Sequence, residues 1–368
     1  MSRIEEINDI NRLLEYRTQW HCLLCRTPRA NFFHTPEWLE IFWKYYGEGA
    51  KLRAFLRWQD KQLTGILPLE VMRQWTRFGP FRYLTYPLSN WGSFYGAIGQ
   101  DPDTIFRDVL SHIADTPRDW DIFEPRWATE SMEAVTQASR LPFAQTLIDH
   151  TTVVEFNGNW DDYFLTLAGR PRNNFHRWQK RLKKVGKLSY IRHRPSGDAQ
   201  NDSDPRWDLY DACEQLASKS WQADSRDGTT LCHEDVRHFL RDLHRAACRV
   251  GGADINLIQL DNKPMAFEYC YCYKGNISAL RKGFDPAFGK FGAGSLLTMF
   301  MIRDSFARGD YLYDMGIGNA DIKRPYGNRQ LPVYRYSHYT KAAPRAQLLR
   351  LKRWLLLYFN RKLNDKKS

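Results

Sequence analysis

The sequence lacks a hydrophobic run long enough to cross a bilayer, which takes about 20 consecutive apolar residues in a helix. Its N-terminal residues, MSRIEEINDINRL, also lack the basic and then apolar regions of a secretory signal peptide, because acidic residues stand in their place. From these two absences we expect a cytoplasmic protein.

Cysteine is scarce, and its spacing argues against two kinds of site. The seven cysteines are odd in number, which in a reducing compartment predicts free thiols rather than a disulfide framework. Cys22 and Cys25 form a CxxC motif, but no second pair follows at the spacing of a zinc site. We therefore predict that the cysteines are small buried apolar residues and that the protein holds no metal.

The overall composition is that of a globular protein. With 368 residues, of which 43% are hydrophobic and 26% charged, the chain is long enough for two domains with separate cores. Aromatic residues are dense, with 13 Trp, 19 Tyr and 21 Phe. Large cores explain this density, and aromatic-lined clefts are the alternative.

Acidic residues are missing from one long segment. Residues 170–194 contain ten Lys or Arg and no Asp or Glu, and residues 341–368 contain nine basic residues against the single Asp365. The net charge of +12 therefore comes from two local surfaces. In the first segment Phe175, Trp178, Leu182 and Val185 recur at helical spacing, which predicts a helix with these residues facing inward and its basic residues outward.

Two segments repeat the same pattern. Residues 32–42 read as a helix, with Thr35 as its N-cap and Pro36 at its first position. They lead into a strand pair over 52–71, with Asp60-Lys61 at the turn. Residues 231–240 open a second helix that leads into a strand pair over 255–273, with Asp261-Asn262-Lys263 at the turn. The chain thus resembles a duplicated α/β module.

A glycine-rich stretch, GKFGAGSLLTMF from Gly289, lies between a predicted strand over 277–284 and a predicted helix from Ser295. It lacks the Lys-Ser/Thr ending of a P-loop and the GxGxxG of a dinucleotide fold. Glycines at the start of a helix let backbone N–H groups approach an anion, but a simple turn also needs glycine. The pattern alone leaves both interpretations open.

Gly289-x-x-Gly292-x-Gly294 before a helix is similar to the pyrophosphate loop of the GNAT acyltransferase superfamily. The longer run from Lys274 to Gly327, together with residues 159–188 and 32–47, resembles the CelD-like branch, which is associated with cellulose and other exopolysaccharide loci. The duplicated module is also similar to the Fem-type aminoacyltransferases.

The resemblance implies an α/β (α+β) fold of two tandem GNAT-like modules, each a mixed, mainly antiparallel sheet flanked by helices. We expect an N-terminal module lacking the cofactor loop (1–155), a basic helical connector (156–195), an acyl-CoA-binding module (196–340) and a basic amphipathic tail (341–368). The tail resembles an interfacial helix that could contact an anionic membrane surface, and packing on the protein is the alternative.

The implied activity is transfer of an acyl group, expected to be acetyl, from acyl-CoA to an amine or hydroxyl of a sugar or polysaccharide precursor. Two alternatives are a Fem-type transferase that uses aminoacyl-tRNA and a non-catalytic module of a polysaccharide-synthesis complex. The non-catalytic alternative stays open because Asn319 and Ile322 replace an acidic residue and a tyrosine of the family's last motif.

Candidate site residues follow from the chemistry. Glu268 is the only charge in the strand MAFEYCYCY and could serve as general base, with exposure to solvent as its alternative. Asp314, Lys323 and Tyr326 are further catalytic candidates, and Lys323 and Tyr326 could contact phosphate or the leaving thiol. The alternatives are a structural role for Asp314 and ordinary loop positions for the other two. Trp91 and Tyr95 could stack on a sugar or lie buried between the modules. The expected acyl-CoA contacts are Arg281, Gly289, Lys290, Phe291, Gly292, Ala293, Gly294 and Ser295.

Overall fold

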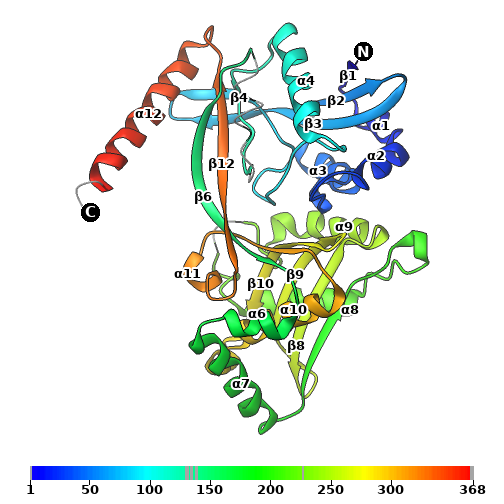
Figure 1. Cartoon of the computed structure of the whole chain (residues 1–368), viewed down its shortest axis with the longest axis vertical. Coiled ribbons are helices and arrows are strands. Elements are labelled where there is room, and N and C mark those ends of the chain that lie inside the picture. The colour runs from blue at the N-terminus through cyan, green and yellow to red at the C-terminus, as the bar shows by residue number, and fades with distance from the viewer. Residues whose placement is uncertain (1, 129–131, 133–135, 137–139, 226–227, 365–368) are drawn as a thin grey trace.

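The computed structural model of the protein describes residues 2–128, 132, 136, 140–225 and 228–364. Helices flank a mixed sheet of 12 strands. Figure 1 shows two halves, one above the other, joined by two long strands, β6 (Ala144–Glu155) and β12 (Arg329–Tyr339). The predicted mixed α/β fold is confirmed.

The first half contains the N-terminal elements. Its strands and helices are β1 (Ser2–Ile7), α1 (Ile10–Leu14), α2 (Arg17–Leu24), η1 (Phe32–His34), α3 (Pro36–Tyr46), β2 (Lys51–Gln59), β3 (Gln62–Thr76), β4 (Gly79–Thr85), α4 (Pro102–Asp115) and β5 (Ile122–Phe123). The last described helix of the chain, α12 (Pro344–Asn364), also lies against this half (Figure 1).

The second half follows β6. Its elements are α6 (Trp160–Thr166), α7 (Gly169–Lys183), β7 (Leu188–His193), η2 (Asp198–Gln200), α8 (Trp207–Lys219), α9 (Glu234–Arg249), β8 (Ala253–Leu260), β9 (Lys263–Tyr273), β10 (Asn276–Phe284), η3 (Pro286–Phe291), α10 (Ala293–Arg308), β11 (Leu312–Ile317) and α11 (Ala320–Lys323).

The strand order is β1-β2-β3-β4-β5-β12-β6-β11-β10-β9-β8-β7. β12 pairs antiparallel with both β5 and β6, so it joins the first five strands to the rest of the sheet. β6, which falls in the predicted first module, pairs with β11 and β12 and therefore extends between the halves. The proposed division at residue 155 stays a prediction.

The repeated unit of helix, strand, tight turn and strand is present in both halves, as α3-β2-β3 and α9-β8-β9. Both turns have two successive residues with positive φ, at 49° and 65° for Asp60-Lys61 and at 49° and 63° for Asp261-Asn262. Two such residues make the type I′ turn that suits the twist of a hairpin. At the start of α3, the Thr35 side chain caps Trp38 N–H and Pro36 takes the first position, as predicted.

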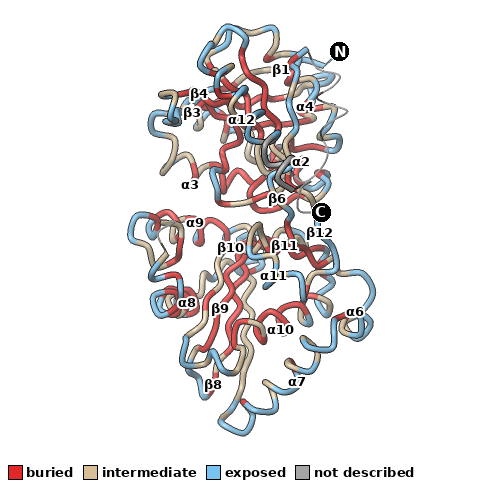
Figure 2. The backbone as a smooth tube through the Cα atoms, turned by 90° about the vertical axis from the view of Figure 1, so that its left-hand side faces the viewer, coloured by how far each residue is buried: buried red, intermediate tan, exposed pale blue. Residues whose placement is uncertain are grey.

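One core cluster reaches across both halves. Phe32 and Phe33 of η1 pack against Tyr271 of β9, with ring centroids 4.4 and 5.9 Å apart. Figure 2 shows buried backbone continuing from the strands of each half toward the region between them. A second cluster surrounds α10, whose side chains Leu296, Leu297 and Met301 are fully or almost fully buried. Burial of apolar surface therefore links the halves and fixes α10 against the sheet.

Three residues differ from prediction in their burial. Phe175 and Leu182 of α7 face inward as expected, but Val185 is 60% exposed because α7 ends at Lys183, before that position. Cys22 and Cys25 are exposed rather than buried, since the inward positions of α2 go to its larger side chains.

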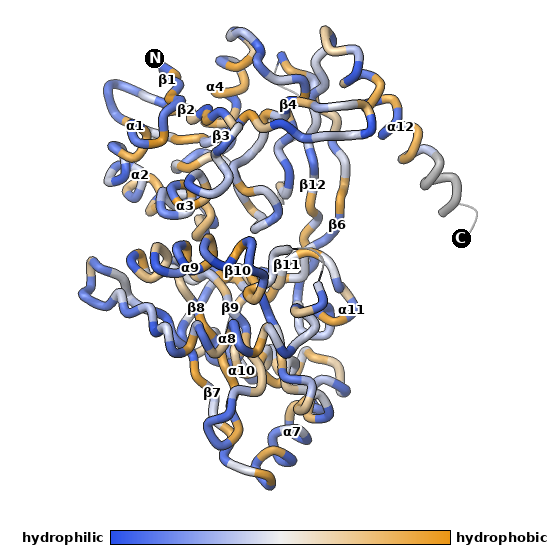
Figure 3. Tube along the Cα trace, turned by 180° about the vertical axis from the view of Figure 1, so that it is seen from behind, coloured by the Kyte–Doolittle hydropathy of each residue, from blue (hydrophilic) through white to orange (hydrophobic). Residues whose placement is uncertain are grey.

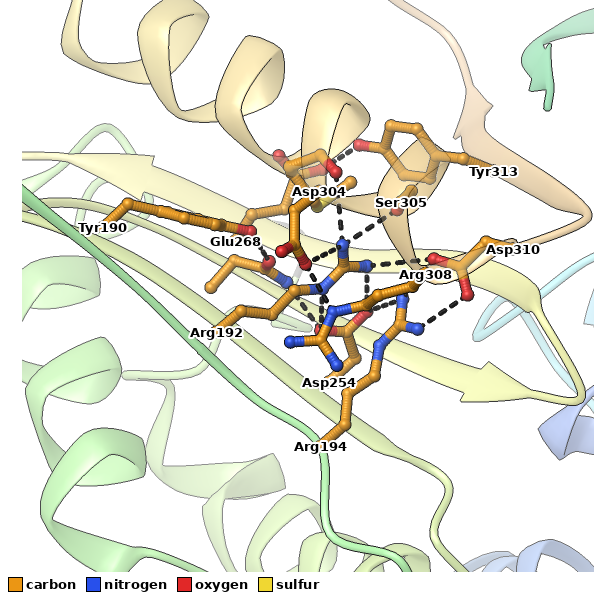
Figure 4. Close-up of polar contacts among 12 residues, drawn as sticks. Tyr190, Arg192, Arg194, Asp254, Glu268, Asp304, Ser305, Arg308, Asp310 and Tyr313 are labelled. Atoms are coloured by element: carbon orange, nitrogen blue, oxygen red, sulfur yellow. Dashed lines mark hydrogen bonds and ion pairs between the residues drawn. The ribbon is translucent and has the colours of Figure 1, made fainter. Parts of the chain in front are cut away.

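A buried ion network fixes α10 to the edge of the sheet (Figure 4). Asp254 of β8 is 0% exposed and accepts hydrogen bonds from Arg192 and Arg194 at 2.8 to 3.0 Å. Arg192 also donates to Asp304 and Ser305 on α10. Burial disfavours the charged form of Asp254, but the two arginines hold its pKa well below the ordinary value.

Replacement of Asp254 by Asn is expected to lower the free energy of unfolding by about 3 kcal/mol, because it leaves two buried guanidinium groups short of a counter-charge. Urea unfolding at neutral pH measures the loss. Asp304→Asn is the matched control, since it removes a half-exposed carboxylate from the same Arg192 and should cost far less. Equal losses in the two variants would contradict a special role for the buried carboxylate.

Candidate functional site

The neighbouring strands β10 and β11 run parallel but pair over only three positions, from Asn276 with Leu312 to Ser278 with Asp314. Beyond this point β10 continues to Phe284 and β11 to Ile317 without pairing to each other. The facing edges of the two strands therefore lack each other as partners beyond this point, although on β11 the side chains of Asp314 and Lys323 bond the backbone of Gly316 and Ile317. We call this opening the wedge.

The glycine-rich stretch lies at the far end of β10. Gly289, Lys290 and Phe291 belong to η3, and Gly292 precedes α10 in the left-handed conformation, with φ at 61°. The N–H of Gly292 donates to Gly289 O at 2.9 Å. In the described residues the next three N–H groups, of Ala293, Gly294 and Ser295, donate to no backbone carbonyl outside the helix, and within a helix the first turn has no acceptor for them.

Two glycines of this stretch serve different purposes. A Cβ on Gly292 would lie 2.4 Å from the ring of Trp178 on α7, so this glycine permits the contact between α7 and α10. A Cβ on Gly294 would meet Phe284 at 3.4 Å and Lys282 at 3.6 Å, which are ordinary packing distances. A Cβ at Gly294, which is buried, would therefore fit without displacing these neighbours.

Lys282, which we did not predict, is the basic residue at this junction. Its ammonium lies 3.2 Å from Glu268 Oε2 and donates to the Thr298 hydroxyl on α10. Lys282 pairs directly with Glu268 across β9 and β10 because a β-bulge between Ala279 and Arg281 shifts the register by one residue. Counting outward from the turn without the bulge would have placed Arg281 opposite Glu268.

Arg281, an expected anion contact, faces the other side of the sheet. Its guanidinium donates to Thr229 O and Leu280 O and lies 5.2 Å from the ring centroid of Trp91. Successive side chains of a strand point to opposite faces, so Lys282 and Arg281 cannot share a ligand on one face. Arg281 therefore lies away from Lys282 and Glu268, and its contact with acyl-CoA stays a prediction.

Glu268 is 2% exposed, so the alternative of a solvent-facing side chain is wrong. Its Oε1 accepts a hydrogen bond from the Tyr313 hydroxyl. Its Oε2 has no hydrogen-bond donor, because the contact with Lys282 is close but poorly directed. A buried acceptor without a hydrogen-bond donor is uncommon. Burial, followed by the charge of Glu268, raises the pKa of Tyr313, which keeps its phenol protonated.

Asp314 is also buried, but its oxygens are fully engaged. It accepts from Ser93 at 2.6 Å, from Thr151 at 2.5 Å and from Gly316 N–H at 2.9 Å. These donors come from the first half, from β6 and from the turn after β11. Burial raises the pKa of Asp314 despite these hydrogen bonds. Such a carboxylate positions the surrounding segments rather than meeting a substrate.

Lys323 and Tyr326 close the same region. The Lys323 ammonium donates to Gly316 O and Ile317 O, and burial lowers its pKa while the nearby charges of Asp314 and Glu268 oppose this shift. Tyr326 is 8% exposed, and its carbonyl accepts a hydrogen bond from the Tyr163 hydroxyl. Both residues therefore hold the turn that follows β11.

The structure places Trp91 and Tyr95 in the core between the halves. Trp91 is 6% exposed and packs against Phe239 at a centroid distance of 5.0 Å. Tyr95 is 4% exposed and stacks on His34 at 5.2 Å. Neither ring offers a free face to a sugar, because core side chains already cover it.

Two kinds of feature are absent from the described residues. No group of three or more His, Cys, Asp or Glu side chains lies in an arrangement that could hold a metal ion. No helix in the described ranges has the length and apolar character needed to span a bilayer.

Three solved structures share this fold over most of their length. FemX matches with a TM-score of 0.62 and 11% identity, over 94% of this chain and 99% of that chain. The C-terminal domain of a putative lysylphosphatidylglycerol synthetase from Agrobacterium fabrum matches with a TM-score of 0.55 and 8% identity, over 93% and 95%. A conserved protein of unknown function from Bacteroides thetaiotaomicron matches with 0.52 and 12%, over 92% and 100%.

At these identities the three structures establish the fold alone. No curated protein matches the sequence. The family model described as "Acetyltransferase (GNAT) domain" matches residues 169–324, which include α7, the wedge strands, the glycine-rich stretch and α10. Residues 169–324, in the second half of the chain, therefore match a GNAT acetyltransferase domain, which supports acyltransferase chemistry.

Proposed function

We propose that the protein transfers an acyl group, expected to be acetyl, from acyl-CoA to an amine or hydroxyl of a sugar used in exopolysaccharide or cell-envelope assembly. The observation that carries the acyl-CoA assignment is the wedge, with the unpaired N–H groups of α10 at its end. The sugar acceptor rests on the resemblance to the CelD-like branch.

The residues present fit acyl-CoA. The N–H groups of Ala293, Gly294 and Ser295, with the positive end of the helix dipole, suit the pyrophosphate. Lys282 adds a positive charge beside them, and exposed Lys290 lies one turn earlier. The free edges of β10 and β11 suit the amide-bearing arm of the cofactor. When bound, acyl-CoA supplies an activated thioester carbonyl.

In this proposal Glu268 takes the proton from the attacking amine or hydroxyl through its unpaired Oε2. Tyr313 donates its hydroxyl hydrogen to Oε1 and so holds the carboxylate in place. In this proposal its protonated phenol also gives a proton to the leaving thiolate. Asp314, Lys323 and Tyr326 position the turn after β11 without touching the reacting groups.

The acyl-CoA assignment predicts that Gly294→Asp weakens CoA binding by about a hundredfold, because a carboxylate would face the pyrophosphate. Isothermal titration calorimetry with CoA and acetyl-CoA measures this loss. Gly294→Ala is the control, since its Cβ has room and its N–H remains, so binding should be unchanged. Gly292 is unsuitable for this test because any side chain there would displace Trp178.

If native protein binds no CoA, or if Gly294→Asp binds as tightly as Gly294→Ala, the glycine-rich stretch is only a turn. The Fem-type alternative then becomes the next hypothesis. It is supported by the basic residues of α7, where Lys180, Lys183 and Lys184 line an open pocket of about 450 Å³. A tRNA complex that weakens steeply with salt would favour it.

Membrane contact is a separate part of the proposal. The outer face of α12 carries Leu348, Leu351 and Trp354, each more than half exposed, and the helix has basic but no acidic residues. Figure 3 shows apolar and polar residues alternating along the described part of this helix. Such a face suits contact with an anionic bilayer surface.

A further inference from the structure

A second pocket, of about 290 Å³, lies in the first half of the molecule. It is formed where α12 packs beside β3, β4 and β12 (Figure 1). The residues that matter here are Gln74, Tyr83, Arg126, Trp127, Arg335 and Arg353. None of them belongs to the wedge or to the glycine-rich stretch.

The charge beside this pocket is unbalanced. Glu124 is 0% exposed and accepts hydrogen bonds from Arg126 at 2.7 Å, from Arg353 at 2.5 Å and from Ser337 at 2.8 Å. Arg335 is a third guanidinium directed at the same carboxylate. Three positive charges thus surround one negative charge, which leaves an excess of two.

Arg335 is only weakly compensated by this carboxylate. Its Nε lies 4.0 Å from Glu124 Oε2, too far for a hydrogen bond, and Nε is buried without an acceptor. Among the described residues its guanidinium donates no hydrogen bond. Burial, with the neighbouring charges of Arg353 and Arg126, lowers the pKa of Arg335 despite the presence of Glu124. A partly buried cation without a hydrogen-bond acceptor costs folding free energy when no ligand is bound.

We propose that this pocket binds a ligand that carries a phosphate monoester, with Arg335 as its main contact. A phosphate monoester bears nearly two negative charges at neutral pH and therefore matches the excess charge of the cluster. Its oxygens can accept two parallel hydrogen bonds from a guanidinium. The guanidinium of Arg335 donates no hydrogen bond within the described residues and can therefore supply them. Tyr83, Trp127 and Gln74 offer apolar and polar contacts to the rest of the ligand. This site is independent of acyl-CoA binding.

Calorimetric titration with methyl phosphate tests the proposal on the full chain. Native protein should bind it, and Arg335→Gln should weaken the affinity at least about tenfold, as expected for loss of hydrogen bonds from a charged group. Arg329→Gln is the matched control, because Arg329 lies on the same strand but pairs with exposed Glu155 outside the pocket. Its affinity should equal that of native protein.

Thermal unfolding without ligand gives a second readout. Arg335→Gln should leave the melting temperature unchanged or raise it, because it removes one of three guanidinium groups that share a single carboxylate. Glu124→Gln should lower it, since three arginines would then lack their counter-charge. The proposal is overturned if native protein binds no methyl phosphate, if Arg335→Gln binds it unchanged, or if Arg335→Gln lowers the melting temperature as much as Glu124→Gln.

The same titration identifies the source of the phosphate. Tighter binding of glycerol 3-phosphate than of methyl phosphate, with no gain from lipid chains, would support a soluble metabolite. Tighter binding of dihexanoyl phosphatidic acid, used below its micelle concentration, would support a lipid headgroup. In either case the gain should disappear in Arg335→Gln.

Discussion

Replacement of Glu268 by Gln is expected to lower kcat/KM for acyl transfer by about 10² to 10⁴, the usual contribution of a positioned general base. Glutamine has the same shape and can still accept the hydrogen bond from Tyr313, but its amide cannot take a proton. The loss should therefore come from chemistry and not from folding. Steady-state rates with acetyl-CoA and an acceptor amine, followed by thiol release, measure it.

The affinity for CoA separates this effect from damage to the wedge. It should be unchanged in Glu268→Gln. Glu155→Gln makes the same chemical change at a surface ion pair and serves as the control. Should Glu268→Gln keep more than a third of native activity, another group must act as base.

The stability of the protein is expected to fall between pH 5 and pH 9 because of Glu70 on β3. This residue is 3% exposed, and among the described residues no donor reaches its carboxyl group. Burial raises the pKa of Glu70 to about 8 from its ordinary value of 4.5. The unfolded chain thus loses this proton at a lower pH than the folded protein, so folding becomes less favourable as pH rises through this window. The linkage amounts to about 4 kcal/mol.

Glu70→Gln should remove this dependence. Guanidinium chloride unfolding of both proteins at pH 5 and pH 9 gives four free energies of unfolding. The change between the two pH values in one protein is compared with that in the other, so any pH-independent effect of the amide cancels. Between pH 5 and pH 9 the free energy of unfolding of native protein should fall by about 4 kcal/mol relative to that of Glu70→Gln. Parallel behaviour of the two proteins would show that Glu70 finds a donor or water in solution.

Local signals in the sequence were sufficient to predict much of the fold. The helix with Thr35 and Pro36 at its start and the hairpins at Asp60-Lys61 and Asp261-Asn262 depend on turn and capping chemistry within a few residues. The strand, glycine-rich stretch and helix around Gly292 follow the same logic. These elements form as predicted because few tertiary contacts compete with the local preference.

The site was predicted less well because its geometry depends on distant contacts. The bulge beside Ala279 brings Lys282, and not Arg281, opposite Glu268. The residue types at this point do not predict a bulge. The contact of Trp178 with Gly292 joins residues more than a hundred positions apart. Ser93 donates to Asp314 from the first half, which only the folded arrangement of both halves reveals.

The position of β12 affects how the protein can be synthesised. This strand is late in the chain yet lies between β5 and β6 in the sheet, so both strands keep an unpaired edge until residues 329–339 have left the ribosome. Contacts between segments so far apart in sequence form slowly, and exposed strand edges pair readily with other chains. Truncation before β12 should therefore produce aggregation of the nascent protein rather than a stable first half, and expression at low temperature or with chaperones should favour the complete sheet.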